Sequence, residues 1–333
     1  MIRRMMQFLV VLVAVGCMPS AAYAQTFSVA SVDSVDVGSL AAGAVGETVL
    51  RVDPASGSVT TISGSGARLT APSARSLVTI SCTVGSNCNV AKSQVTISAT
   101  GSPSGRALAL RNFTVSTLGA SATLATQPGT GSSISFTLQP IGLNQSKTFW
   151  VGFDLPIRGD DSGVLSNSAT SQFIVTVSRL NNTGFNSRSQ SAVANVVRAI
   201  AISKSTDLGF GRIVPPSAGS GIVSLSQATG QVSVTGTGTA VLPVPTPTVA
   251  QFAVSGEGGQ SVSVSIPPSF TMAGPSGTIQ VTTSSNVSGA QVLSGLAGSG
   301  GTLAIRVGGS YPIGSSTQKG TYAGSFTVMV QYN

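Results

Sequence analysis

The chain has 333 residues and a formal net charge of +8, yet charged residues make up only 8% of it. Its Lys and Arg residues form no cluster and no basic stripe interleaved with aromatics, which argues against a nucleic-acid partner. Histidine is absent, which excludes Ser/His/Asp and Cys/His catalysis and every metal site that uses an imidazole. The composition therefore predicts neither an enzyme nor a cofactor-binding protein.

Residues 1–24 have the layout of a secretion signal. Two arginines precede an apolar run over residues 8–15, and a small-residue cleavage motif ends at Ala24. The run is too short to span a bilayer. We expect cleavage between Ala24 and Gln25 and export through the periplasm. A second interpretation makes Cys17 a lipid-acceptor cysteine.

Beyond the signal, short runs of alternating apolar and polar residues are separated by turns of Gly, Ser and Asn. No segment shows a convincing 3.6-residue period. This pattern is typical of an all-β protein. Strands with so little charge suit a protein that works in an assembled state, because exposed edges would otherwise pair without control.

Cys82 and Cys88 are the only cysteines that remain after cleavage. They flank the turn Gly85-Ser86-Asn87 at the end of an apolar strand over residues 78–80. Two cysteines without a histidine make a poor zinc site, whereas the oxidising periplasm favours a bond between them. The sequence predicts a structural Cys82–Cys88 disulfide.

The mature sequence contains an internal repeat of two copies. Asp36-Val37-Gly38 in the first copy matches Asp207-Leu208-Gly209 in the second, and residues 173–177 match 326–330. Three more blocks keep the same order, namely residues 49–59 with 222–232, 63–66 with 235–238, and 151–157 with 307–313. The chain is long enough for two ordinary domains, so each copy is expected to form a β-sandwich.

The boundary between the copies falls in a stretch rich in Asn and Ser. We expect a first domain over residues 25–180, a linker over 181–198 and a second domain over 199–333. Apolar residues nevertheless recur at even spacing after residue 190, at Ala192, Ala194, Val196, Ile200 and Ile202. An alternative is that this stretch completes the first domain in cis before it enters the second.

The first copy carries the candidates for receptor binding. Its extra residues, near 102–143, are where we expect a receptor site. Trp150, the only tryptophan, follows Phe149 on a strand and could stack on a sugar, although packing is the simpler interpretation. The tripeptide Arg158-Gly159-Asp160 permits an integrin-type interpretation, with an ordinary solvated loop as the alternative.

The last strand of the chain directs four side chains to one face, those of Phe326, Val328, Val330 and Tyr332. Tyr332 is penultimate, and Gly320 stands fourteenth from the end. This ending resembles the C-terminal signature of bacterial chaperone–usher fimbrial subunits. Residues 199–333 are also similar to a pilin-like domain family of unknown function, which is itself similar to the Mat, or common-pilus, major subunit.

The resemblance implies two tandem immunoglobulin-like (pilin-like) β-sandwiches, of which the second is incomplete. In such subunits the last strand borders a groove that a periplasmic chaperone fills first and a donor strand of a neighbouring subunit fills later, at an outer-membrane usher. The residues expected to contact these partners are Gly320, Phe326, Val328, Val330 and Tyr332. The first copy has Arg179 in place of Tyr332, which argues against the same role for its own last strand.

Little chain precedes the first domain. Setting Asp36 opposite Asp207 leaves only residues 25–28 ahead of it, too few for a donor arm that extends about 3.3 Å per residue. A subunit that receives a strand and donates none belongs at the tip of a fibre. The sequence therefore predicts an adhesive fimbrial subunit at the cell surface that binds a host or surface receptor. The alternative is a self-sufficient secreted module that binds carbohydrate or protein.

Overall fold

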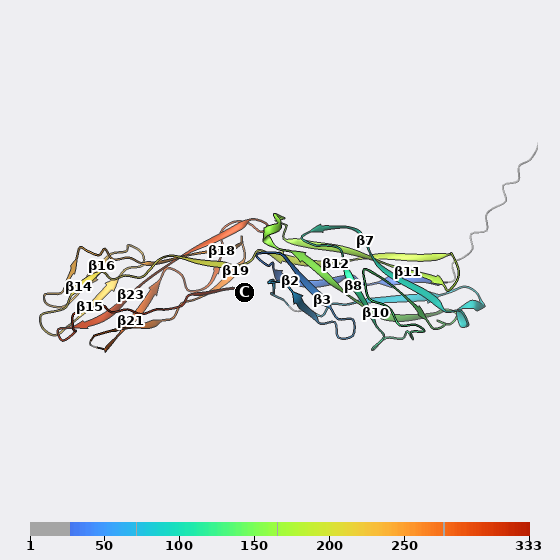
Figure 1. Ribbon diagram of the computed structural model, residues 1–333, viewed down its shortest axis with the longest axis horizontal. Coiled ribbons are helices and arrows are strands. Elements are labelled where there is room, and N and C mark those ends of the chain that lie inside the picture. Colours follow the sequence, from blue (N-terminus) through green and yellow to red (C-terminus); the bar gives the residue numbers. More distant parts are fainter. Residues whose placement is uncertain (1–26, 71, 165, 276) are drawn as a thin grey trace, which may run out of the picture.

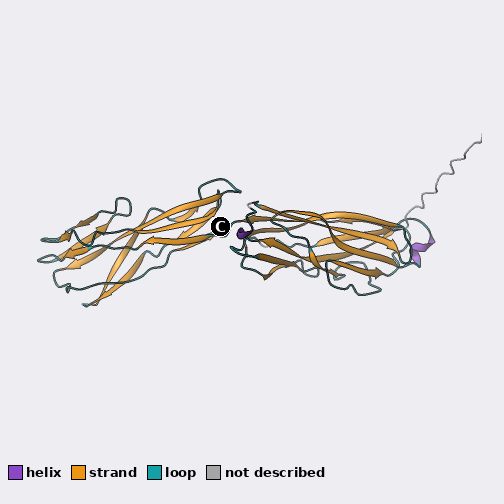
Figure 2. Cartoon of the chain, turned by 45° about the horizontal axis from the view of Figure 1, so that its top comes forward, coloured by secondary structure: helices purple, strands orange, loops and turns teal. Residues whose placement is uncertain are grey.

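The computed structural model describes residues 27–333 except 71, 165 and 276. The signal peptide, Cys17 and the expected cleavage site at Ala24 and Gln25 lie outside the described residues. Figure 1 shows two bodies, one after the other along the chain, with the C-terminus near the place where they meet. Strands make up most of both bodies (Figure 2), so the all-β prediction is confirmed. Among the described residues, no helix has the length and hydropathy needed to cross a membrane.

The first body is a sandwich of two sheets. One sheet contains β1 (Phe27–Val32), β3 (Glu47–Val52), β4 (Val59–Ser63), β6 (Ser76–Cys82), β8 (Arg111–Ser116) and β10 (Gln145–Arg158). The other contains β2 (Val35–Ala41), β5 (Ala67–Arg68), β7 (Ser93–Gly105), β9 (Ser133–Leu138), β11 (Ser168–Arg179) and β12 (Phe185–Val197). Two short 3-10 turns, η1 (Ser86–Asn89) and η2 (Asp160–Ser162), lie in the loops. The sheet orders are β1-β6-β10-β3-β4, with β8 also paired to β10, and β5-β2-β12-β11-β7-β9.

Alternation along these strands builds one continuous core in the first body. Phe173, on β11, is fully buried, and its ring lies 6.2 Å from that of Phe113 and 5.8 Å from that of Phe153, measured between centroids. Full burial of such a side chain contributes about 1.5–3 kcal/mol. The core of the first body is therefore closed and well packed.

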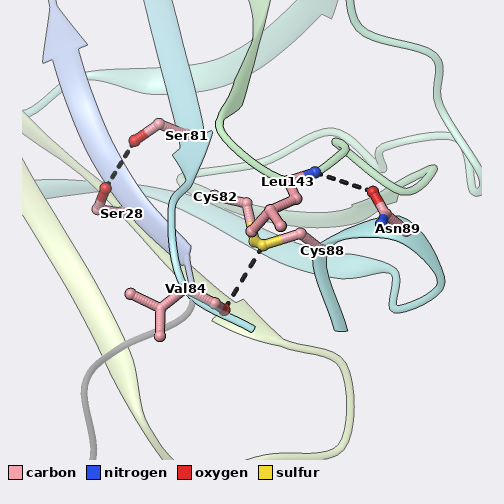
Figure 3. Close-up of a disulfide and its surroundings, with 7 residues drawn as sticks. All are labelled: Ser28, Ser81, Cys82, Val84, Cys88, Asn89 and Leu143. Atoms are coloured by element: carbon pink, nitrogen blue, oxygen red, sulfur yellow. Dashed lines mark hydrogen bonds between the residues drawn. A yellow bond between two sulfur atoms is a disulfide. The ribbon is translucent and has the colours of Figure 1, made fainter. Parts of the chain in front are cut away.

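The predicted disulfide is present. Cys82 ends β6 and Cys88 lies in η1, with their Cα atoms 5.7 Å apart. Figure 3 shows the bond closing the loop after β6, beside Val84 and Leu143. The Leu143 N–H donates to the side-chain oxygen of Asn89 at 2.9 Å, which ties a second loop to the same end of the sandwich.

The expected linker over 181–198 is wrong for most of its length, because residues Phe185–Val197 form β12. This strand pairs with β11 in antiparallel register and with β2 in parallel register. Its inward side chains are buried in the core, namely Ala192, Ala194 and Val196. A strand needs only one apolar face, and Ser187, Ser189, Ser191 and Asn195 lie on the other. Asn186 shares the face of Ala192, and its side-chain oxygen accepts the Val29 N–H at 2.8 Å. The first body extends to Val197, and the alternative of completion in cis is the observed one.

The second body contains the corresponding strands in three sheets. The largest contains β13 (Ala201–Thr206), β15 (Ser220–Leu225), β16 (Val232–Val234), β18 (Ala250–Glu257), β20 (Ser269–Gly274), β21 (Gly277–Ser285) and β23 (Gly300–Gly314). The two smaller ones contain β14 (Arg212–Val214) with β17 (Ala240–Leu242), and β19 (Ser261–Ser265) with β22 (Gly289–Val292) and β24 (Met329–Tyr332).

The larger sheets of the two bodies have the same strand order. The order β13-β18-β23-β15-β16 matches β1-β6-β10-β3-β4, and β21 pairs with β23 as β8 pairs with β10. Val177 of β11 lies opposite Val95, and Val330 of β24 lies opposite Val264. This register gives β24 the place in the second body that the end of β11 has in the first.

Candidate functional site

The two bodies differ at one strand. The sheet β5-β2-β12-β11-β7-β9 is continuous in the first body, whereas its counterpart is split into β14-β17 and β22-β19-β24. No strand within the described ranges takes the place of β12, so β24 is an edge strand, paired only with β19. An edge strand presents N–H and C=O groups that can pair with another strand. We call the space between β14 and residues 320–332 the sheet gap.

The side chains that border the sheet gap are only partly covered. In the first body, Phe173 and Val175 lie beside β12 and are fully buried. Their counterparts Phe326 and Val328 are half-buried, and so are Val330 and Tyr332. The core beneath them is divided into two separate clusters rather than one. The second body is thus less well packed where β12 has no counterpart.

Residues 320–328 hold their place without a regular ladder. An isolated bridge joins Ala323 to Ala273 through two hydrogen bonds of 2.8 and 3.0 Å. Glycine permits this close approach, since a Cβ on Gly324 would lie 2.2 Å from the Thr271 carbonyl oxygen. At Gly320 a Cβ would lie 2.4 Å from Cγ of Pro275. A side chain at either position would push the segment away from β20.

A hollow of about 970 Å³ lies at the end of the sheet gap far from β24. Its apolar lining comes from Phe210, Met272, Ile279, Tyr311, Ile313 and Tyr322. The rings of Phe210 and Tyr311 meet edge to face with centroids 4.9 Å apart. Burial raises the pKa of the Tyr311 hydroxyl to about 12. An apolar-lined space of this size makes the hollow a candidate binding site.

The middle of the sheet gap has a filled floor. The Phe326 ring lies 5.2 Å from that of Phe270 and 6.3 Å from that of Phe252, measured between centroids. These three rings lie between the two core clusters. The sheet gap is therefore deep only at the hollow and shallow in its middle, where the three rings fill it.

Tyr332 closes the other end of the sheet gap, beside the first body. Its hydroxyl donates to the carbonyl oxygen of Arg198 at 2.8 Å and accepts the N–H of Glu257 at 2.7 Å. Burial raises the pKa of Tyr332 above its ordinary value, and the hydrogen bond from Glu257 opposes this effect. Glu257 is itself buried, and its carboxylate accepts the N–H of Arg198 at 3.2 Å and the N–H of Gly298.

The residues predicted from the chain end lie along one line of the second body. Gly320 is at the rim of the hollow, Phe326 in the middle, and Tyr332 at the end beside the first body. Sequence reasoning missed Phe210 and Tyr311, which line the hollow from segments far apart in the chain. A signal was present, because Leu208 and Phe210 alternate with glycines just after the Asp207 that aligns with Asp36.

Two candidates in the first body have structural partners. Asp160 accepts hydrogen bonds from Arg106 Nη1 at 2.6 Å and from the Ala199 N–H at 2.9 Å, and Arg106 is only 1% exposed. This carboxylate is engaged inside the protein, which weighs against the integrin-type interpretation. The guanidinium of Arg75 lies 3.7 Å from the ring centroid of Trp150 and covers one face that a sugar would need.

Residues 200–332 match the model of a family described as a domain of unknown function, DUF4402. No curated protein matches the chain. Similar solved structures include a chain from a chaperone–tip adhesin complex described as vital for activation of CFA/I fimbriae biogenesis, with 10% identity, 90% of this chain and 97% of that chain covered, and a TM-score of 0.26. A mutant of the adhesin CfaE of CFA/I from enterotoxigenic E. coli is 9% identical, with 90% of this chain and 93% of that chain covered and a TM-score of 0.26. The collagen-binding subdomain of the Enterococcus faecalis surface protein ACE is 11% identical, with 37% of this chain and 86% of that chain covered and a TM-score of 0.18.

Proposed function

We propose that the protein is a subunit of a bacterial surface fimbria and that its second body receives a strand from another protein. The observation that carries this proposal is the sheet gap, because β12 fills the corresponding place in the first body. An incoming strand would form main-chain hydrogen bonds with the free edge of β24 and residues 320–328. Its inward side chains would cover Phe326, Val328 and Val330.

Two occupants would follow one another in the sheet gap. An exported chain with an open, partly apolar edge is prone to aggregate, so a periplasmic chaperone would supply the first strand. A neighbouring subunit would supply the final one at an outer-membrane usher. Each large apolar side chain that becomes buried adds about 1.5–3 kcal/mol, so the filled second body would be far more stable than the open one.

The first body would be the adhesive part of a subunit at the fibre tip. It is complete in itself, since β12 closes its sheet. Its first strand is already committed, because β1 pairs with β6 and Phe27 is buried. If the signal is cleaved after Ala24, only Gln25 and Thr26 precede β1, too few to fill a neighbour's gap. A host or surface receptor would then bind the first body.

Thermal unfolding of the mature chain from Gln25 tests strand addition. A strand of alternating apolar residues is appended after Asn333, and a matched control strand carries Asp at its inward positions. We expect two transitions, of which the apolar strand raises only one, while the Asp strand raises neither. Two unchanged transitions in all three proteins would instead indicate a self-sufficient secreted module that binds carbohydrate or protein without a partner strand.

A further inference from the structure

We infer that the end of the first body that lies farthest from the second body binds an anionic lipid surface. We call this end the far pole. It consists of the loops over residues 83–92, 139–144 and 180–184 and the strand ends that hold them. Figure 2 shows the 3-10 turn η1, part of the first of these loops, at the end of the first body remote from the second. The inference does not depend on strand addition, because the far pole lies outside the sheet gap.

The three loops of the far pole are tied to one another. The disulfide closes the first loop. The second loop is joined to it by the Gly142 N–H, which donates to the carbonyl oxygen of Cys88 at 2.9 Å. The third is joined by the Leu180 N–H, which donates to the carbonyl oxygen of Lys92 at 3.0 Å. Side chains on these loops are therefore held in place relative to one another.

Large apolar side chains are exposed at the far pole. Among the described residues of the first body, seven large apolar side chains are exposed, and four of them belong to the far pole. These four are Val84, Val90, Leu143 and Phe185, with exposed fractions of 46%, 73%, 40% and 58%. Figure 3 shows two of them, Val84 and Leu143, beside the disulfide. Single exposed apolar residues are ordinary, but a group at one end of a closed sandwich indicates an interaction surface.

The charges at the far pole all have one sign. No Asp or Glu occurs in residues 79–149 or 162–198. The acidic residue closest to the far pole by strand position is Asp33, whose N–H donates to Leu77, five positions along β6 from Cys82. Four basic residues lie on the loops or close beside them, and none of them takes part in an ion pair among the described residues. They are Lys92, Lys147, Arg179 and Arg188.

An anionic lipid surface fits both features at once. Its head groups attract Lys and Arg side chains that come within a Debye length, and the acyl boundary beneath accepts apolar side chains. A soluble polyanion would satisfy the cations but would leave Val90 and Phe185 in water. An uncharged apolar groove would cover these two side chains but would leave the cations without a partner. In the proposed fibre the second body is joined to the shaft, so the far pole would face outward.

Binding of the full mature chain from Gln25 to lipid vesicles tests the inference. One set of vesicles is phosphatidylcholine alone, and the other is phosphatidylcholine and phosphatidylserine in equal parts. Flotation measures the bound fraction as lipid is added. We expect binding to the anionic vesicles that weakens as salt is raised, and binding to the neutral vesicles that is weaker by at least about tenfold.

Matched variants locate the surface. Val90→Ser should weaken binding to the anionic vesicles by about fivefold. Its control is Val45→Ser, because Val45 is also 73% exposed but lies at the opposite end of the first body, next to the Gly46 that is bonded to Asp161. Lys92→Glu should weaken binding by about tenfold. Its control is Arg158→Glu, an exposed cation at that opposite end. Both controls should bind as the unchanged protein does.

Each other outcome contradicts the inference in a different way. If the controls weaken binding as much as the far-pole variants, another surface meets the lipid. If neutral and anionic vesicles bind equally, the cations have no part in it. If neither vesicle binds, the far pole does not recognise lipid, and an acidic protein surface becomes the partner to test. None of these results affects strand addition, which is measured on the second-body transition.

Discussion

The hydroxyl of Tyr332 is hydrogen-bonded to the carbonyl oxygen of Arg198 across 2.8 Å. This bond joins the last strand of the second body to the short segment between the two bodies. On the first-body side, the Ala199 N–H is bonded to Asp160. The penultimate tyrosine therefore has a second role besides bordering the sheet gap, because its hydroxyl fixes the segment that connects the two bodies.

Tyr332→Phe should lower the stability of the second body by about 1–3 kcal/mol, because the Glu257 N–H loses its acceptor in a buried setting. The ring that borders the sheet gap is kept. Urea unfolding followed by a probe in the second body measures the effect. Tyr322→Phe is the control, since its hydroxyl bonds the Gln318 carbonyl oxygen at an exposed position, and it should cost less. Equal costs would contradict the role of the Tyr332 hydroxyl.

Val328→Asp should abolish accumulation of the protein in the periplasm. Val328 faces the sheet gap, and a charge there would be buried by any incoming strand. Met329→Asp is the matched control, because Met329 is 62% exposed and points the other way. Soluble periplasmic yield of the two variants is the measurement. A near-normal yield of Val328→Asp would contradict the strand-addition proposal.

The second body should lose stability between about pH 10 and pH 12. A tyrosine with a raised folded pKa holds its proton more tightly when folded, so its contribution is complete below its unfolded pKa of about 10 and is lost as the pH rises above it. Tyr311 has a folded pKa of about 12. Thermal midpoints over this pH range should fall less in Tyr311→Phe. The first body contains no tyrosine, so a tyrosine-linked loss of similar size in its transition would contradict this explanation.

Replacing Cys82 and Cys88 by Ser should destabilise the first body alone. The disulfide closes a short loop, and the chain-entropy estimate for such a loop is about 2 kcal/mol. Both positions are fully buried, so the polar hydroxyls add to the loss. Calorimetry with and without a reductant compares the two transitions. A shift of the second-body transition would mean that the bodies do not unfold separately.

Asp160→Asn should lower the stability of the first body by about 3 kcal/mol, because it leaves Arg106 buried without its ion-pair partner. Arg158→Ala removes the exposed first residue of the same tripeptide and should change stability little. Denaturant midpoints of the two variants provide the comparison. If the two variants lose equal stability, the Asp160–Arg106 pair does not stabilise the loop.

Alternation alone predicted which side chains of residues 326–332 share a face, because that property is local. It overestimated the strand itself, since only Met329–Tyr332 form β24. Strand geometry over residues 320–328 requires a neighbour on the open side. The linker prediction failed for a related reason. Composition does not show whether a polar stretch is a linker or the solvent-exposed face of a strand whose other face, here with Ala192, packs in a core. The hollow was beyond prediction, since Phe210 and Tyr311 meet only through the fold.

β12 ends at Val197 and β13 begins at Ala201, so almost no slack separates the two bodies. In a fibre under traction, a pull on the second body would be transmitted along the axis of β12. That strand is paired with β11 along one edge and with β2 along the other. Its ladder bonds would bear the load together in shear and would not peel open one at a time. In the proposed fibre, β12 would therefore both complete the sheet of the first body and connect that body to the second.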